Sequence, residues 1–377
     1  MTPLLSLIIP TRERARTLVS TLATATAQAS RDFEIVVSDN MSADTTREVV
    51  TAAAENDDRI RYLNSGARLS MCGNYEFALE KARGDYVVII GDDDAVMPGG
   101  LDRLLARLRA LSKPTIHMWP LHIYDWPVGK LPAKVAYLAP KIPEFTLDLK
   151  AKALDVVRRG AWKYYELPSP YHSAIPRAIL SQIRNRTGRV FHSTQPDVFT
   201  AMAIPAYADR AINLGTTITL NGRSAQSNGL GFVQRKARAN IDRFIAEYGD
   251  YRFHPTLATG VPAAANMIPD AVLLAVDLFP ELYHGVDFNY SAMWAYICRI
   301  GFMSHAEVLR RARRIGQAHD FSVPRFARFA ALHQAAVGRR KLLNAATPLG
   351  GLAVTVPATI DEFVRALARE PKRTRGW

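Results

Sequence analysis

The first hundred residues alternate short apolar runs with stretches of helical composition. Three runs, Leu4–Ile9, Phe33–Val37 and Tyr86–Ile90, are partly β-branched and end at turn-forming or polar residues, as strands buried on both faces do. Residues 16–28 and 45–56 lie between them and have the composition of helices. Strands that alternate with helices favour a doubly wound, mostly parallel sheet, so we expect an α/β fold.

Three consecutive aspartates, Asp92 to Asp94, follow the third run. Adjacent carboxylates repel each other, and in open α/β sheets ligands bind outside the carboxyl ends of strands. A hard divalent cation fits this position, because one or two carboxylates hold it while substrate phosphates complete its shell. The alternative is an Asp-rich turn whose side chains cap the helix that starts near Pro98.

Polar residues also follow the other strands at this sheet edge. Thr11 and Asp39 come directly after two of the strands, so we expect them to line one crevice with Asp92. A nucleotide fits such a crevice. The chain has neither the Gly-rich dinucleotide pattern after its first strand nor a P-loop, so we expect a metal ion to neutralise the phosphates.

The same region holds an ordered set of short motifs. They are Ile8-Ile9-Pro10-Thr11-Arg12, Phe33 to Asn40 with Ser42 and Asp44-Thr45-Thr46, Arg68 and Asn74, Ala82-Arg83-Gly84-Asp85-Tyr86, the aspartate triplet, and Pro98. The set resembles the family-2 glycosyltransferases over about the first 110 residues. This resemblance implies a GT-A fold, Rossmann-like with helices on a mostly parallel sheet. It also implies an inverting, Mn²⁺- or Mg²⁺-dependent transfer of a sugar from a nucleotide-sugar donor.

The resemblance further implies which residues bind the donor. Thr11 and Asp39 match positions that hold the nucleobase, and Arg12 shares the motif of Thr11. Arg68 matches a basic residue that contacts the nucleotide, and Asn74 follows it in the same motif. The resemblance favours a UDP-sugar as the donor.

The three aspartates are expected to differ in role. By the resemblance, Asp92 contacts the ribose and Asp93 binds the metal that bridges the diphosphate, whereas Asp94 supports the site or caps the next helix. Many members of the family carry a further acid where this chain has Gly91.

The candidate catalytic base is Asp197. In the resembled family the base is an Asp or Glu roughly a hundred residues after the metal motif, near the start of a helix. Pro196 suits a first helical turn, and the positive end of that helix would keep the neighbouring carboxylate of Asp197 ionised. The alternative is that Asp197 only caps a helix over residues 198–206.

Other residues of the middle region are candidates for the acceptor side. His172, His192 and Gln195 could each hydrogen-bond an acceptor hydroxyl or a phosphate, although a lone histidine is more often an ordinary structural residue. Tyr171 and Trp162 are candidates because aromatic faces pack against sugar rings.

The net charge of +13 is concentrated near the C-terminus. Residues 301–377 contain 14 Lys and Arg against 5 Asp and Glu, and arginines are dense in the amphipathic segments 306–315 and 326–343. Such helices either lie on an anionic membrane surface or form the solvated face of a helical cap or an oligomer contact. No nucleic-acid recognition module accompanies them, so we expect no nucleic-acid partner.

The two cysteines are far apart and match no metal or redox spacing, and the sequence has no transmembrane-length apolar run and no signal peptide. We therefore expect a cytoplasmic protein, which would be peripheral at the inner face of the membrane if its basic helices bind lipid. We expect residues 1–110 to form the nucleotide-sugar-binding half of a GT-A domain. Residues 111–225 would form its acceptor-binding and catalytic half, and residues 226–377 a mainly helical, basic region.

The expected function is glycosyl transfer to a saccharide or lipid-linked acceptor in bacterial surface glycan synthesis. One alternative is a nucleotidyltransferase that makes nucleotide sugars, but such enzymes usually have a Gly-rich loop after the first strand, which this chain lacks. Another is a non-catalytic nucleotide-binding protein that docks through its basic C-terminus.

Overall fold

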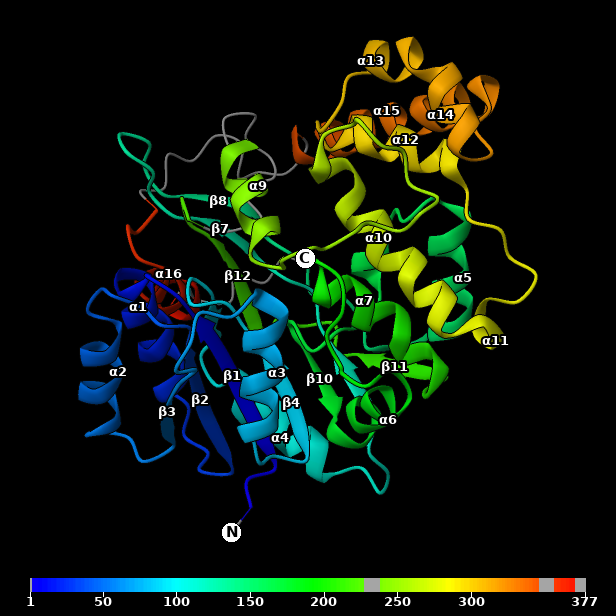
Figure 1. Cartoon of the computed structure of the whole chain (residues 1–377). Coiled ribbons are helices and arrows are strands. Elements are labelled where there is room, and N and C mark those ends of the chain that lie inside the picture. Colours follow the sequence, from blue (N-terminus) through cyan, green and yellow to red (C-terminus); the bar gives the residue numbers. More distant parts are fainter. Residues whose placement is uncertain (1, 227–237, 346–355, 370–377) are drawn as a thin grey trace.

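A mixed sheet of eight strands forms the centre of the molecule, in the order β3-β2-β1-β4-β10-β6-β11-β9 (Figure 1). The computed structural model describes residues 2–226, 238–345 and 356–369. The first half of the sheet contains β1 (Leu5–Thr11), α1 (Ala15–Thr26), β2 (Phe33–Asp39), α2 (Thr46–Ala54), β3 (Ile60–Asn64), α3 (Met71–Lys81) and β4 (Tyr86–Ile89). Its four strands are parallel, so their carboxyl ends meet at one edge.

The predicted strands and helices of the first hundred residues are present, with ends that differ by a few residues. Both faces of β2 and β4 are buried, which explains their continuous apolar runs. Asp44 connects two helix starts, because its carboxylate accepts hydrogen bonds from the backbone N–H groups of Ala15 (3.0 Å) and Thr46 (3.1 Å).

The second half of the sheet completes the α/β domain. It contains α4 (Gly100–Arg109), β6 (Ile116–Met118), β9 (Phe145–Asp148), α5 (Leu149–Arg158), the short helix η1 (Tyr164–Glu166), β10 (Ser173–Pro176), α6 (Arg177–Thr187), α7 (Pro196–Ala203), the short helix η2 (Ile204–Ala206) and β11 (Arg210–Asn213). Strand β10 runs antiparallel to β4 and β6 and joins the two halves.

A second, four-stranded sheet has the order β5-β12-β7-β8. Its strands are β5 (Ala95–Val96), β7 (Ile123–Asp125), β8 (Lys134–Tyr137) and β12 (Thr219–Arg223). Strand β5 directly follows the aspartate triplet and pairs with β12, which brings the end of the α/β domain next to the aspartates.

Helices make up the rest of the described chain. They are α9 (Arg238–Ala246), α10 (Ala263–Leu278), α11 (Pro280–Tyr283), α12 (Tyr290–Arg299), α13 (His305–Arg310), α14 (Ala312–Ala318), α15 (Val323–Ala345) and α16 (Ile360–Arg369). Most of them gather beside α5 and α7, whereas α16 returns to the N-terminal half and lies by α1 (Figure 1). There Ile360, Phe363 and Val364 pack against Tyr124 and Leu220.

The arginine-rich helices α13, α14 and α15 pack apolar side chains into the core of the helical region. Val308, Ile315 and Phe326 are buried in the core of the helical region, together with Trp294 of α12. These apolar side chains therefore contact the core of the helical region, and membrane association through the basic surface of these helices stays a prediction. No helix within the described ranges combines the length and the apolar composition that crossing a membrane requires.

Candidate functional site

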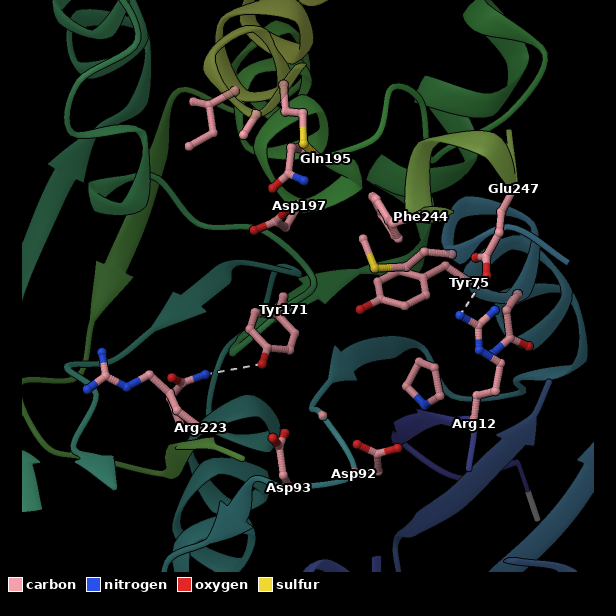
Figure 2. A pocket seen from close by; sticks show the side chains of 18 of the residues that line it. Arg12, Tyr75, Asp92, Asp93, Tyr171, Gln195, Asp197, Arg223, Phe244 and Glu247 are labelled. Atoms are coloured by element: carbon pink, nitrogen blue, oxygen red, sulfur yellow. Dashed lines mark hydrogen bonds and ion pairs between the residues drawn. The ribbon is translucent and has the colours of Figure 1, made fainter. Parts of the chain in front are cut away.

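A cavity of about 440 Å³ opens at the carboxyl ends of β1 and β4 (Figure 2). Three parts of the chain line it. The sheet edge and α3 contribute Pro10, Thr11, Arg12, Arg14, Asn40, Met71, Asn74, Tyr75, Gly91, Asp92 and Asp93. The middle region contributes Tyr164, Tyr171, Gln195, Asp197, Asn221 and Arg223, and the helical region contributes Phe244, Glu247, Ala264, Met267, Ile268, Tyr296, Ile300 and Phe302.

Asp92 is held on both sides. Its Oδ2 accepts a hydrogen bond from the hydroxyl of Thr11 (2.7 Å), and its Oδ1 forms an ion pair with Nη1 of Arg14 (2.9 Å). Thr11 and Asp92 are thus brought together across the ends of β1 and β4, as the sheet topology predicted. The ion pair fixes the carboxylate at the cavity wall and balances its charge.

Asp93 is the aspartate that lacks an ion pair among the described residues. Its Oδ2 accepts from the backbone N–H of Ser224 (3.0 Å), and the indole of Trp126 donates to its backbone oxygen (2.8 Å). Burial, together with the carboxylates of Asp94 and Asp92, raises the pKa of Asp93 to about 7. A buried carboxylate beside two other acids and facing a cavity has the chemistry of a cation ligand.

This donor set fits a divalent cation that shares its ligands with a substrate. Among the described residues, no group of three or more His, Cys, Asp and Glu side chains is placed to hold a metal by itself. An ion at Asp93 would therefore complete its shell with oxygens from a bound molecule, as Mg²⁺ usually does with phosphates.

Asp94 has a different setting. It is fully buried and accepts hydrogen bonds from the backbone N–H groups of Gly91 and Gly222, from the hydroxyl of Tyr171 (2.9 Å), and from Nε2 of His172 (3.1 Å). Asp94 does not cap the following helix. The N-cap residue of α4 is Gly99, and no side chain makes a capping hydrogen bond at that helix start. The helix-capping alternative is therefore wrong, and Asp94 joins β4, β12 and the loop before β10.

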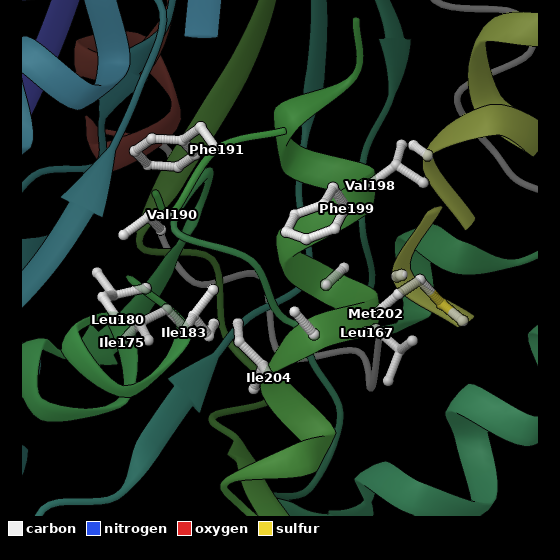
Figure 3. Packing of buried hydrophobic residues seen from close by; sticks show 14 of the residues in the cluster. Leu167, Ile175, Leu180, Ile183, Val190, Phe191, Val198, Phe199, Met202 and Ile204 are labelled. Atoms are coloured by element: carbon white, nitrogen blue, oxygen red, sulfur yellow. The ribbon is translucent and has the colours of Figure 1, made fainter. Parts of the chain in front are cut away.

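Asp197 lies on the wall opposite Asp92 and Asp93 (Figure 2). It occupies the first turn of α7, directly after Pro196, and burial raises its pKa. Helix α7 is anchored by Val198, Phe199 and Met202, which are fully buried among apolar side chains of α6 and its flanking loop (Figure 3). The packing of α7 holds the carboxylate at the cavity surface.

The predicted donor residues are placed unequally. Arg12 lines the cavity and forms an ion pair with Glu247 (2.8 Å). Asn74 also lines it, although its amide is bound to Ser38. Asp39 is buried behind the cavity wall.

The carboxylate of Asp39 accepts from the hydroxyl of Tyr62 (2.7 Å) and from the backbone N–H of Ser42 (3.0 Å). Arg68 is exposed on the loop before α3 and does not belong to the cavity lining. The structure therefore gathers Thr11, Arg12 and Asp92 at the cavity, and places Asp39 and Arg68 outside its lining.

Of the predicted acceptor residues, Gln195 and Tyr171 line the cavity, whereas Trp162, His172 and His192 do not. His172 is buried between Asp94 and the hydroxyl of Thr219 (2.7 Å). His192, on the loop after α6, forms a hydrogen bond through Nε2 with the hydroxyl of Thr187 (3.1 Å) at the end of that helix, and burial lowers the pKa of His192 to about 4. Neither histidine belongs to the cavity lining, and their role as contacts of the acceptor stays a prediction.

Sequence reasoning missed several lining residues. Arg14 lies three residues after Thr11, the last residue of β1. Its position close to the end of that strand could have indicated that it lines the cavity. Tyr75, Tyr164 and Tyr296 come from three separate helices, and no local pattern distinguishes them from core aromatics.

Comparison with known proteins agrees with this geometry. Residues 6–149 match the sequence profile of the family Glycosyl transferase family 2. A Campylobacter jejuni protein, GalNAc(5)-diNAcBac-PP-undecaprenol beta-1,3-glucosyltransferase, is 37% identical over 106 residues, which are 28% of this chain and 34% of the relative. The Escherichia coli protein WcaA, a putative colanic acid biosynthesis glycosyl transferase, is 28% identical over 109 residues, or 29% of this chain and 39% of the relative.

The chain thus spans little more than a third of the length of these curated relatives. The solved structure of S. aureus TarS 1–349 in complex with UDP-GlcNAc is similar over 83% of this chain and 79% of that chain, with a TM-score of 0.51 and 13% sequence identity. This likeness confirms the predicted α/β fold of the GT-A type with a helical C-terminal region. The predicted resemblance to the family-2 glycosyltransferases is thus confirmed for residues 6–149.

Proposed function

We propose that the protein transfers a sugar, with inversion, from a nucleotide sugar to a hydroxyl group of a saccharide or lipid-linked acceptor. The observation that carries this proposal is the arrangement of one cavity, with Asp93 at the sheet edge of a family-2 domain and Asp197 on the opposite wall. Asp93 would act on the leaving nucleoside diphosphate, and Asp197 would act on the attacking hydroxyl group.

In this proposal the nucleotide occupies the sheet edge. Asp92, held by Thr11 and Arg14, accepts a hydrogen bond from a ribose hydroxyl. Arg12 and Asn40 line the neighbouring wall, where the nucleobase would lie. If Asp39 holds the nucleobase, its carboxylate must give up the hydrogen bond from the Tyr62 hydroxyl and accept one from the base. If Arg68 contacts the nucleotide, it must move toward the cavity from its exposed loop. We favour a UDP-sugar as the donor.

Asp93 would hold Mn²⁺ or Mg²⁺ in the same state. When bound, this ion would offset the negative charge on the departing nucleoside diphosphate. The backbone N–H of Ser224 and the indole of Trp126 keep the Asp93 segment in place on β12 and β7.

Asp197 would act as the general base. The acceptor oxygen attacks the anomeric carbon while Asp197 removes its proton, and the bond from that carbon to the diphosphate breaks. The burial that raises the pKa of Asp197 makes its carboxylate a stronger base than a solvated aspartate. Tyr164 and Tyr171 also line the cavity, where an aromatic ring would pack against a bound sugar.

The relatives support the setting of this reaction. The Campylobacter jejuni relative is named as a glucosyltransferase for a PP-undecaprenol glycan, and the Escherichia coli relative as a colanic acid enzyme. By analogy, we propose that this chain acts in the synthesis of a bacterial surface polysaccharide or glycan.

The Asp197→Asn substitution tests the proposed base. We expect donor hydrolysis, in which water replaces the acceptor, to fall by about 10²-fold or more, because a general base contributes roughly this factor. Binding of the UDP-sugar should be unchanged, since Asp197 lies on the acceptor side. The measurement is UDP release from a panel of UDP-sugars with Mn²⁺, beside donor binding by calorimetry.

Asp58→Asn is the matched control, because the side chain of Asp58 is 80% exposed and remote from the cavity lining. It should hydrolyse the donor at the wild-type rate. A wild-type rate in Asp197→Asn would remove Asp197 from the mechanism.

A further inference from the structure

A cluster of cations surrounds one aromatic ring beside the cavity. The charged groups of Arg159, Lys163 and Arg299 lie 5.7, 5.4 and 5.3 Å from the centre of the Trp162 ring. Trp162 is half-buried, so the cluster reaches solvent. Sequence reasoning predicted Trp162 only as a sugar-stacking residue, and the cations were not anticipated.

The cluster borders the acceptor side of the cavity. Lys163 is followed directly by Tyr164, which lines the cavity, and Arg299 lies one helical turn after Tyr296, which also lines it. The ring of His333 packs against both Trp162 (4.3 Å between ring centres) and Tyr296 (6.3 Å). Only one ring therefore separates the cations from the cavity wall.

The charges of the cluster are incompletely balanced. Arg159 forms an ion pair with Asp155 (2.7 Å), and Lys163 forms one with Glu166 (2.7 Å). Arg299 has no carboxylate partner within the described parts of the chain, although it sits among other cations. An unpaired guanidinium on an aromatic face presents its remaining N–H donors to a ligand.

His333 adds a second, independent sign of a ligand. Its side chain is 3% exposed, and its Nε2 has no hydrogen-bond partner among the described residues. Its Nδ1 lies 3.5 Å from Nη1 of Arg299. A buried ring nitrogen without a partner beside an unpaired arginine indicates a polar group that is supplied from outside the chain.

The loop that carries Trp162 is strained and fixed. Ala161 and Lys163 both have φ of +71°, which is unusual for residues with a side chain. A Cβ on Gly160 would lie 2.1 Å from the backbone nitrogen of Met293, so the loop is pressed against α12. Such strain persists where the surroundings enforce it, and it holds Trp162 and Lys163 against the helix of Arg299.

We propose that Arg299, together with Trp162 and Lys163, binds a phosphate group that the acceptor carries. This inference rests on the proposed glycosyl transfer, and it narrows the acceptor class to phosphate-bearing molecules. Arginine matches the geometry of a phosphate with two parallel N–H donors, and Lys163 adds a point charge. A neutral sugar would leave the excess positive charge of the cluster unbalanced.

Calorimetric titrations test this site on the full chain that is already saturated with UDP and Mn²⁺. The probes are geranyl phosphate, inorganic phosphate and geraniol. We expect geranyl phosphate to bind to the wild type and to bind about tenfold more weakly to Arg299→Gln, because a charged hydrogen-bond partner is lost. Arg299→Lys should recover part of the affinity, and Arg310→Gln, which changes an exposed arginine of α13, should bind as the wild type does.

The probes also distinguish the source of the phosphate. Binding of geranyl phosphate but not of inorganic phosphate supports a lipid-linked acceptor, and equal binding of both supports a phosphate on any acceptor. Binding of geraniol alone, no binding of either phosphate, or unchanged binding in Arg299→Gln overturns the proposal. Unaltered UDP binding shows that the variant is folded. If the wild type fails to bind UDP, the proposed function fails, and the same titrations without UDP still test the phosphate site.

Discussion

Asp92, Asp93 and Asp94 are chemically identical side chains in three different surroundings. Arg14 neutralises Asp92, whereas Asp94 is saturated by hydrogen-bond donors. Asp93 has no ion pair among the described residues, and burial with the neighbouring carboxylates raises its pKa to about 7. The sequence predicted this inequality through a family resemblance, but the partners that produce it are up to 131 residues away, as for Ser224 and Asp93.

The structural role of Asp94 leads to a stability prediction. In Asp94→Asn, the amide group must face one of the donors that now bind the carboxylate, and a buried donor is left without an acceptor. We expect the free energy of unfolding to fall by about 2–3 kcal/mol, measured by urea denaturation. Asp58→Asn, at an exposed position, should change it by less than about 0.5 kcal/mol. Equal stability of Asp94→Asn and the wild type would show that the network contributes little.

The two candidate histidines, His172 and His192, lie outside the cavity lining. His172 and His192 were plausible ligands because imidazole binds hydroxyls and phosphates. The fold instead buries His172 against Asp94 and Thr219, and it turns His192 toward Thr187. No local pattern in the sequence contains these long-range partners.

At the scale of elements, the position of the segment that carries Asp93 depends on β12. Gly222 of β12 lies against the backbone of Asp93, and a Cβ at that glycine would come within 1.7 Å of the Asp93 carbonyl oxygen. The backbone of Asp93 cannot move aside as a flexible side chain could, so only glycine fits at position 222. The close approach also allows the Gly222 N–H to reach Asp94 (2.7 Å).

Gly222→Ala should therefore displace the segment that carries Asp93. We expect the variant to lose the Mn²⁺-dependent part of UDP binding, measured by calorimetry. Gly316→Ala is the matched control, because its added Cβ would meet nothing closer than 4.0 Å. It should bind UDP as the wild type does. Wild-type Mn²⁺ dependence in Gly222→Ala would contradict the described coupling between β12 and Asp93.

The elements of the first hundred residues were predictable because their signals are local. Apolar runs such as Phe33–Val37 are buried on both faces, and the polar residues after them lie at strand ends. The parallel topology then brings Thr11 to Asp92. The later strands are short, and β10 reverses direction, so their pairing has no comparable local signal.

At the scale of the whole molecule, the helical region completes the cavity. Phe244, Glu247, Met267 and Tyr296 come from its helices and from the residue after α9. Composition predicted a basic helical appendage but not a wall of the site, because these contacts join residues more than 200 positions apart, as in the pair Arg12–Glu247. The wall of the cavity opposite the sheet edge is therefore formed largely by residues outside the family-2 match.

The whole molecule should lose stability in mild acid. Burial lowers the pKa of His122, His192, His319 and His333 to about 4, below the ordinary value of 6.5. Below pH 6.5 these histidines bind protons in the unfolded chain but stay neutral in the folded chain. The free energy of unfolding therefore falls as the pH falls. The raised pKa values of Asp93, Asp197 and Asp270 act in the opposite direction, but these are three groups against four.

We expect the urea midpoint of unfolding to decrease steadily from pH 7.5 through 6.5 to 5.5. The measurement is equilibrium unfolding followed by fluorescence at each pH. A midpoint that is constant or rises over this range would mean that these histidines become protonated without unfolding.

The most direct test of the central proposal, a nucleotide site that is completed by a cation at Asp93, is UDP binding measured by calorimetry with and without Mn²⁺. We predict that Mn²⁺ tightens UDP binding to the wild type at least about tenfold, since phosphate oxygens complete the shell of the ion. Asp93→Asn should lose this enhancement, while Asp58→Asn keeps it. An enhancement that persists in Asp93→Asn, or UDP affinity that is independent of Mn²⁺ in the wild type, would contradict the account.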